Sequence, residues 1–425
     1  EKASLLLILA KGSKKTATKN RLREQDLRKI VDVFNTQQEI EGYSRLVPIE
    51  EIEKKEFNLN IPRYIDNQDS EDIQDIEAHL KGGIPNKDLD DLKAYWQVYP
   101  ALRDELFDDL RDSYSQLQVE KDQVKQTIYS HPEFESYADE VESVFTSWQQ
   151  EVEPTLKGIA EDTRPKKLIR QISEKLIQSF ESLHLIDKYD VYQHLMTYWK
   201  QTMQDDVYLI AANDWQPQVE PILTKSGNKK GWKSALIPKK IVINKYFEEE
   251  AREIEKLRNQ LEQIEQESDE LEQEHTGEGG ILEEAKSEAG NVTLSNIRSK
   301  ISEYKGEPEF SDELEVFERY LELHNRARNQ KKKIKKAEKE LDKQLLEKYQ
   351  EFDENEVKTL VVEDKWLANL QEAVQDEMDR ISRNLTERIK ELVERYEKPL
   401  PELEEEVEEL EKKVKENLEE MGFAW

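Results

Sequence analysis

Residues 247–271 read FEEEAREIEKLRNQLEQIEQESDEL, and the apolar residues of this stretch recur at heptad-like intervals. The recurring positions are Phe247, Ile254, Leu257, Leu261, Ile264 and Leu271. This spacing predicts one long helix with an apolar seam. A second seam of similar length follows at Tyr320, Leu323, Ala327, Ile334, Ala337, Leu341 and Leu345. Two such helices in one chain predict an antiparallel hairpin with arms of about 45 Å, for about 30 residues at 1.5 Å per residue.

Shorter apolar stripes predict helices in the rest of the chain. One expected helix covers Glu24–Phe34, with Leu27, Ile30, Val31 and Phe34 on its apolar face, and another covers Trp366–Arg395. Short apolar runs at Ala3–Ala10 and Asp206–Ala212 predict buried strands. We therefore predict a mainly α protein with a helical domain, a long antiparallel coiled-coil hairpin and a few short β-strands. The expected segments are 1–66, a helical domain at 67–240, the hairpin at 241–352 with its tip near 277–310, and C-terminal helices at 353–425.

The composition excludes several classes of protein. The chain has 425 residues, a formal net charge of −31 and no cysteine. The absence of cysteine rules out disulfides, thiolate metal sites and cysteine nucleophiles, and it fits a reducing, cytoplasmic location. No apolar run approaches the roughly 20 residues that span a bilayer. Because the net charge repels nucleic acid and anionic membranes, any DNA contact must come from a local basic patch or from a partner.

Two basic patches stand out against this acidic background. The first follows the strand at 3–10, which we expect to be the edge or last strand of a larger sheet preceding Glu1. It lies in a predicted loop and offers Lys14, Lys15, Lys19, Arg21 and Arg23 as candidate DNA contacts. The second patch, KKKIKK at 331–336, lies on the second heptad helix. We expect it to pair with the acidic face of the opposite arm, and DNA contact is the alternative.

Residues 57–66 read FNLNIPRYID and have no helical period. Pro62 removes a backbone donor and favours extended geometry at Ile61. Asparagines alternate with apolar residues, so a short extended segment with one apolar face is expected. We interpret it as a tether that leads from one domain into the helices of an assembly. The side chains that we expect to serve assembly here are Asn60, Arg63 and Tyr64.

The sequence contains no recognisable catalytic apparatus. Its six histidines are scattered without metal-binding spacing, and neither a nucleophile elbow nor a Walker loop occurs. Gly277, Gly279 and Gly280 stand between coiled-coil elements, so they end a helix and do not form a phosphate loop. We therefore predict no catalytic, cofactor-binding or metal-binding residue in this chain.

The C-terminal residues form one more acidic, amphipathic stretch. Its apolar stripe consists of Leu403, Val407, Leu410, Val414 and Leu418, and the chain closes with Phe423–Trp425. The stripe predicts a helix that docks on a partner or on the chain's own body. We assign its five apolar residues to assembly.

Several motifs together resemble the C-terminal part of the methylation subunit of type I restriction-modification systems. The most specific is FNLNIPRYID at 57–66, preceded by Tyr43-Ser44-Arg45 and Glu50-Glu51-Ile52. Downstream, GGIPNKDLDDLKAYWQVYP at 82–100, DVYQHLMTYWKQTMQDD at 190–206 and KTLVVEDKWL at 358–367 resemble the longer members of that family. The resemblance covers nearly the whole chain.

The resemblance implies an adenine-N6 DNA methyltransferase that uses S-adenosylmethionine when intact. Its base-flipping motif, Asn/Asp-Pro-Pro-Phe/Tyr, is missing here, because Asn60-Ile61-Pro62-Arg63 lacks the second proline and the aromatic residue. No catalytic residue can therefore be transferred, and 1–66 is expected to be the tail of a truncated methyltransferase domain. Implied partners are the specificity subunit, a second methylation subunit and DNA through the complex, with the restriction subunit as a further candidate. The alternative is a free-standing coiled-coil scaffold unrelated to DNA modification.

Overall fold

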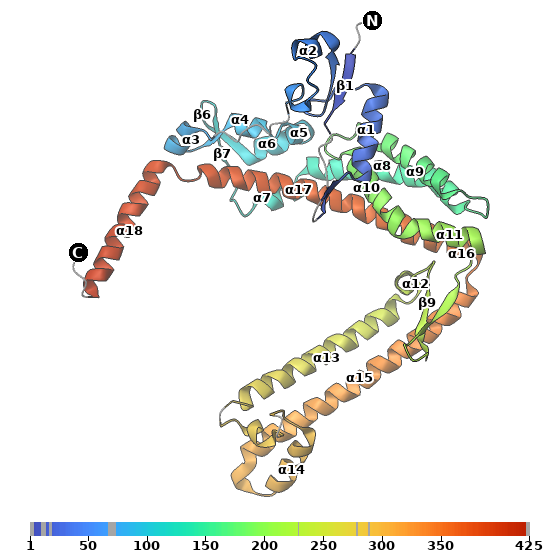
Figure 1. Cartoon of the computed structure of the whole chain (residues 1–425). Helices are drawn as coiled ribbons and strands as arrows, with labels where there is room; N and C mark the ends of the chain where they lie inside the picture. Colours follow the sequence, from blue (N-terminus) through green and yellow to red (C-terminus); the bar gives the residue numbers. More distant parts are fainter. Residues whose placement is uncertain are drawn as a thin grey trace. The chain divides into compact units, whose positions relative to one another are not determined.

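The computed structural model describes residues 4–9, 14–16, 19–66, 74–227, 229–277, 279–287 and 290–421, without the side chains of residues 14–16, 19–20 and 420. The chain divides into two compact units, Glu1–Asp214 with Trp366–Trp425 and Trp215–Lys365. The described part is mainly helical with a few short strands, which confirms the predicted fold class (Figure 1).

The first unit begins with a small sheet that has its own core. Strand β1 (Ser4–Ile8) pairs antiparallel with β4 (Ser44–Pro48), and Leu6 lies opposite Leu46. The elements around this sheet are β2 (Lys14–Thr16), β3 (Lys19–Arg21), α1 (Glu24–Thr36), α2 (Ile49–Lys54) and the 3-10 turn η1 (Ile61–Arg63). The core itself consists of Leu7, Val47, Ile52, Tyr64 and Ile65.

Two expectations for this region are wrong. The strand at 3–10 is not fully buried, because Leu7 is the one residue of β1 in the core and Leu5 is 37% exposed. Residues 57–66 do not form an extended segment with an apolar face, because Phe57 has a positive φ and is 68% exposed. Pro62 lies in the first turn of η1, where the fixed φ of proline suits a helix start.

The rest of the first unit is a helical domain that includes the C-terminal helices. Its helices are α3 (Ile76–Lys81), α4 (Asn86–Asp90), α5 (Lys93–Val98), α6 (Pro100–Leu106), α7 (Val124–Ser130), α8 (Pro132–Lys157), α9 (Pro165–Ser179), α10 (Lys188–Tyr198), α11 (Gln204–Asn213), α17 (Ala368–Tyr396) and α18 (Leu400–Glu420), with the 3-10 turn η2 (Phe180–Ser182) and the π-helix η3 (Trp199–Met203). A three-stranded sheet in the order β5 (Ile84–Pro85), β7 (Tyr114–Leu117) and β6 (Phe107–Arg111) lies among them.

Helix α17 packs against α7 and α10, and its predicted apolar stripe is buried (Figure 1). Its buried apolar residues are Leu370, Val374, Met378, Ile381, Leu385, Ile389 and Leu392. The 3–4 spacing of these residues produces one continuous apolar face, which explains why a 29-residue helix is stable in this position.

The strand predicted over Asp206–Ala212 is instead helix α11, which continues the π-helix η3. A short apolar run does not distinguish a strand from a buried helix, and here helical spacing wins because Val207 and Ile210 are both fully buried. The start of this helix is held by Asp206, whose carboxylate accepts a hydrogen bond of 2.8 Å from the Trp366 indole.

The second unit contains the predicted hairpin. Helix α13 (Glu248–His275) and helix α15 (Ser311–Glu351) lie side by side (Figure 1). They run antiparallel, because Arg258 bonds Glu338 near one end and Tyr320 bonds Glu272 near the other. The other elements of this unit are β8 (Val219–Leu223), β9 (Lys229–Ser234), α12 (Lys239–Tyr246) and α16 (Glu354–Lys358), and the π-helix η6 (Thr359–Leu367) follows.

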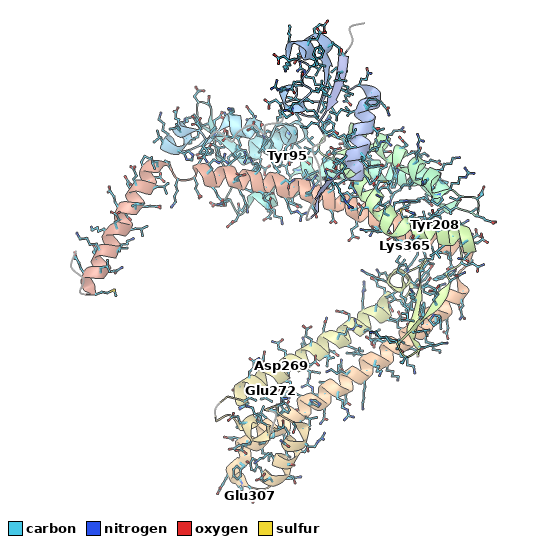
Figure 2. All side chains as sticks on the ribbon, viewed as in Figure 1. Tyr95, Tyr208, Asp269, Glu272, Glu307 and Lys365 are labelled. Carbon is cyan, nitrogen blue, oxygen red and sulfur yellow. The ribbon has the colours of Figure 1, made fainter. Side chains whose placement is uncertain are left out.

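The tip of the hairpin has a core of its own. It is built from η4 (Ile281–Ala285), α14 (Leu294–Tyr304) and η5 (Pro308–Phe310). Leu282, Ile297 and Phe317 are fully buried there, and Tyr304 stacks on Phe310 with 4.3 Å between the ring centroids. Figure 2 labels Glu307 at this tip and Asp269 and Glu272 on the adjoining end of α13.

Candidate functional site

Segment 57–66 closes the small N-terminal core. Tyr64 is 5% exposed, and its hydroxyl donates a hydrogen bond of 2.6 Å to the carbonyl oxygen of Asn58. The ammonium group of Lys55 lies 4.2 Å from the centroid of the Tyr64 ring. Asn60 and Arg63 are exposed. The structure therefore places two of the three predicted assembly residues of this segment on the surface and Tyr64 in the core.

Four of the five basic residues predicted to contact DNA lie on a hairpin, where a loop was expected, and Arg23 is the N-cap residue of α1. Strands β2 and β3 pair antiparallel, with Lys14 opposite Arg21 and Thr16 opposite Lys19. Arg21 on β3 is exposed. The side chains of Lys14, Lys15 and Lys19 lie outside the described residues. Arg23 is engaged by Asp26 at 3.0 Å, and this hydrogen bond raises the pKa of the Arg23 guanidinium.

Helix α1 is attached to the helical domain through polar contacts. Gln25 donates from its backbone to the Gln193 amide at 3.1 Å and from its side chain to the Asp190 carboxylate at 2.6 Å. Arg28 forms a bidentate ion pair with Glu174, at 2.8 and 2.9 Å. These partners stand on α9 and α10, more than 140 residues away in the chain. Sequence reasoning missed this contact, because no local pattern links residues so far apart.

The apolar face of α1 is consequently turned outward. Leu27, Val31 and Phe34 are 46%, 52% and 65% exposed, although these residues were expected to form the packing face together with Ile30, which is half-buried. Val33, on another side of the helix, is buried instead. Three large apolar side chains at helical spacing thus form an open surface next to the small sheet.

A buried carboxylate joins α17 to α10 close to the same contact. Glu377 is 5% exposed and accepts hydrogen bonds from the Arg380 guanidinium, one of them at 2.9 Å. Arg380 also reaches Asp190 at 3.3 Å, so the network continues to Gln25 on α1. Burial by itself raises the pKa of Glu377, but the hydrogen bonds from His194 and Arg380 outweigh it and lower this pKa to about 2. Burial raises the pKa of Asp190.

Helix α18 presents its predicted apolar stripe to solvent. Leu403, Leu410 and Val414 are 41%, 59% and 54% exposed. Val407 is exposed as well, and Leu418 is half-buried. The beginning of the helix contacts α3, and no other described element covers the stripe. A helix with one apolar face of this length is unstable alone in water, so the face calls for an occupant.

Every strand pair among the described residues is antiparallel. In the part of the chain that the structure describes, no group of three or more His, Asp or Glu could hold a metal ion. Nor is any helix in that part long and apolar enough to cross a bilayer.

The N-terminal segment is similar to known DNA methylases. Residues 1–73 match the family model described as N-6 DNA methylase. More particularly, the chain is similar to the type I restriction enzyme MjaVII methylase subunit of Methanocaldococcus jannaschii, with 40% identity over 62 residues. This match spans 15% of the chain and 11% of that protein. No solved structure matches the chain. The predicted resemblance to type I methylation subunits is thereby confirmed for the N-terminal segment, and the resemblance of the downstream motifs stays a prediction.

Proposed function

We propose that this chain is the C-terminal, non-catalytic assembly region of a type I restriction-modification methylation subunit. In this role, it links an adenine-N6 methyltransferase domain to the specificity subunit and to DNA. The intact subunit would use S-adenosylmethionine, while this region supplies none of the cofactor site. A second methylation subunit and the restriction subunit are further expected partners in the complex.

The observation that carries the proposal is the open apolar stripe of α18. Positions Leu403, Val407, Leu410 and Val414 alternate at intervals of four and three, the spacing of a coiled-coil seam. Between Leu400 and Glu420 there are ten glutamates and three lysines, which is a formal charge of −7. A second copy of this helix would meet like charges, so the favoured occupant is a helix of the specificity subunit with an apolar seam and basic flanks.

The exposed apolar face of α1 supports the proposed connection to the methyltransferase domain. It belongs to the segment that matches the N-6 DNA methylases, and it lies beside the open sheet of β1 and β4. We assign Leu27, Val31 and Phe34 to packing against the methyltransferase domain, for which residues 1–66 form the tail. The polar contacts of Gln25 and Arg28 would then hold this domain at a fixed orientation on the assembly helices.

The proposal is tested by co-purification with the cognate specificity subunit. The variant V407S/L410S/V414S removes three half-exposed apolar side chains that the partner would bury. Completing their burial contributes about 1 kcal/mol each, so the triple variant should weaken association by about 3 kcal/mol, or roughly a hundredfold in Kd.

The matched control is E405S/K412S/E419S on the opposite face of the same helix, which has a helix-propensity cost at least as large as that of the stripe variant and leaves the stripe intact. Circular dichroism of each variant checks that the helical content is retained. Equal association of the wild type and the stripe variant would refute the assembly role of α18, as would equal losses in the stripe and control variants.

A further inference from the structure

A continuous basic face runs along the outside of the hairpin helix α15. It consists of Arg328, Lys332, Lys335, Lys336, Lys339 and Lys343. All six side chains are exposed. At 100° per residue, they fall on the side of the helix opposite the buried seam of Leu323, Ile334 and Leu341. Of the acidic residues between 328 and 343, Glu338 lies nearer the seam, and Asp342 and Glu340 border the two edges of the basic face.

The opposite arm does not neutralise this basic face. The ion pairs between the arms come from other positions: Lys331 reaches Glu265 at 2.6 Å, Arg319 reaches Glu267 at 2.8 Å and Arg258 reaches Glu338 at 2.6 Å. The expectation that the KKKIKK run pairs with the opposite arm is therefore met at Lys331. It fails for Lys332, Lys333, Lys335 and Lys336, none of which has an ion pair within the described residues. The helical repeat turns Lys332, Lys335 and Lys336 away from α13.

Like charges along the basic face repel one another, and Glu340, four residues after Lys336, offsets only part of this repulsion. Arg328 and Lys332 are four residues apart, as are Lys332 and Lys336, Lys335 and Lys339, and Lys339 and Lys343. Among the residues that the structure describes, only Lys343 of this face has an ion-pair partner, Glu347 at 3.6 Å. Such like-charged pairs oppose helix formation in isolation. A polyanion laid along the face would remove this repulsion, and it would find here a concentrated positive surface in a chain of net charge −31.

We propose that the basic face of α15 binds the phosphate backbone of duplex DNA. The face extends about 22 Å, for 15 residues at a rise of 1.5 Å, which is long enough to follow several phosphates. It carries cations without aromatic platforms, so it suits the backbone of a duplex better than unstacked bases. The choice of DNA as the polyanion rests on the proposed function, because the same chain carries an N-6 DNA methylase segment. Contacts of this kind are independent of base sequence.

The test measures binding of the full chain to a labelled duplex of random sequence, by fluorescence anisotropy at several salt concentrations. Each phosphate contact contributes about −0.9 to the slope of log K against log salt. The variant K332Q/K335Q/K339Q should therefore reduce the magnitude of the slope by about 2.7 and weaken binding more than tenfold at low salt. Glutamine preserves helix propensity, and the three sites are exposed, so the hairpin should remain folded.

The matched control is K240Q/K256Q/K305Q, which removes the same charge from three exposed lysines of the same unit that lie off this face. It should keep the wild-type slope. The proposal is overturned if the wild type does not bind DNA at low salt, or if both variants lose affinity equally, since the effect would then come from net charge.

The experiment also tests two other polyanions as occupants of the basic face. If the wild type binds vesicles of anionic lipid through these lysines and does not bind DNA, the occupant is a membrane surface and the proposal fails. If the wild type self-associates, the basic-face variant does not, and neither binds DNA, the occupant is an acidic helix of a second copy. Association with the specificity subunit should be unchanged in K332Q/K335Q/K339Q. If the wild type associates with the specificity subunit but does not bind DNA, this inference alone is refuted. If it binds DNA through the basic face but does not associate with the specificity subunit, the proposed function alone is refuted.

Discussion

Replacing Glu377 by glutamine should destabilise the first unit in a pH-dependent way. The Glu377 carboxylate is almost completely buried, and Arg380 and His194 contact it. Its pKa in the folded protein is about 2, against about 4.5 in an unfolded chain. A folded-state pKa below the unfolded value means that the charged group stabilises the fold above pH 4.5, and that this stabilisation is lost as the pH falls toward 2.

The size of the effect follows from the two pKa values. A difference of about 2.5 pH units corresponds to about 3.4 kcal/mol at pH 7, as an order of magnitude. At pH 3, the same linkage leaves about 1.4 kcal/mol, because the unfolded chain then binds the proton and most folded molecules do not. E377Q should therefore cost about 3 kcal/mol at pH 7, and this cost should shrink by about 2 kcal/mol at pH 3.

Equilibrium unfolding in urea, followed by tryptophan fluorescence at pH 7 and pH 3, measures both values. Most tryptophans, including Trp148 and Trp366, lie in the first unit and report on its unfolding. The control is E181Q, which removes a carboxylate that is 67% exposed and paired with Lys188 at 2.7 Å. It should cost much less, because water screens an exposed pair. An E377Q cost that is absent at pH 7, or equal at both pH values, would refute the reasoning.

Two further predictions concern the contacts that hold each unit together. Arg28→Ala removes the bidentate pair with Glu174, so it should lower the stability of the α1 contact by about 2 kcal/mol and speed proteolytic cleavage within 24–36. Arg28→Lys should restore the contact only in part, because lysine cannot form the bidentate pair. Unchanged cleavage of Arg28→Ala would contradict the assigned role. Gln330→Leu replaces a buried amide that donates to the Leu257 carbonyl oxygen at 3.1 Å in the hairpin seam. It should raise the thermal midpoint of the hairpin, by about 1 kcal/mol in stability, as seen by circular dichroism. A lower midpoint would show that the amide contributes net stability.

The long helices were predictable because their information is local. The heptad intervals of α13 and α15 and the stripe of α17 recur every three or four residues, and burial of one face follows directly from that period. The α11 segment was predicted wrongly as a strand because seven apolar-rich residues satisfy either period. The 57–66 segment was wrongly taken as extended, although Pro62 was identified, because proline also suits the first turn of a helix.

The candidate sites, too, were predictable only where they depend on local residue spacing. The α18 stripe and the cations of α15 can be read from residue spacing, but whether another part of the chain covers or neutralises them cannot. That Arg28 meets Glu174, and that Gln25 meets Asp190, depends on residues brought together from distant parts of the chain.

The sequence by itself determined the helical class, the hairpin, the acidic character and the family resemblance, because each of these depends on composition, on local period or on a contiguous motif. Only the tertiary structure decided which faces are occupied. It turned the polar side of α1 inward and left Leu27, Val31 and Phe34 exposed, and it placed Lys332, Lys335 and Lys339 opposite the seam. The physical reason is that the helical repeat assigns each residue to a face of the helix, and this can be derived from the sequence. Packing against distant segments then determines which face remains exposed for a partner.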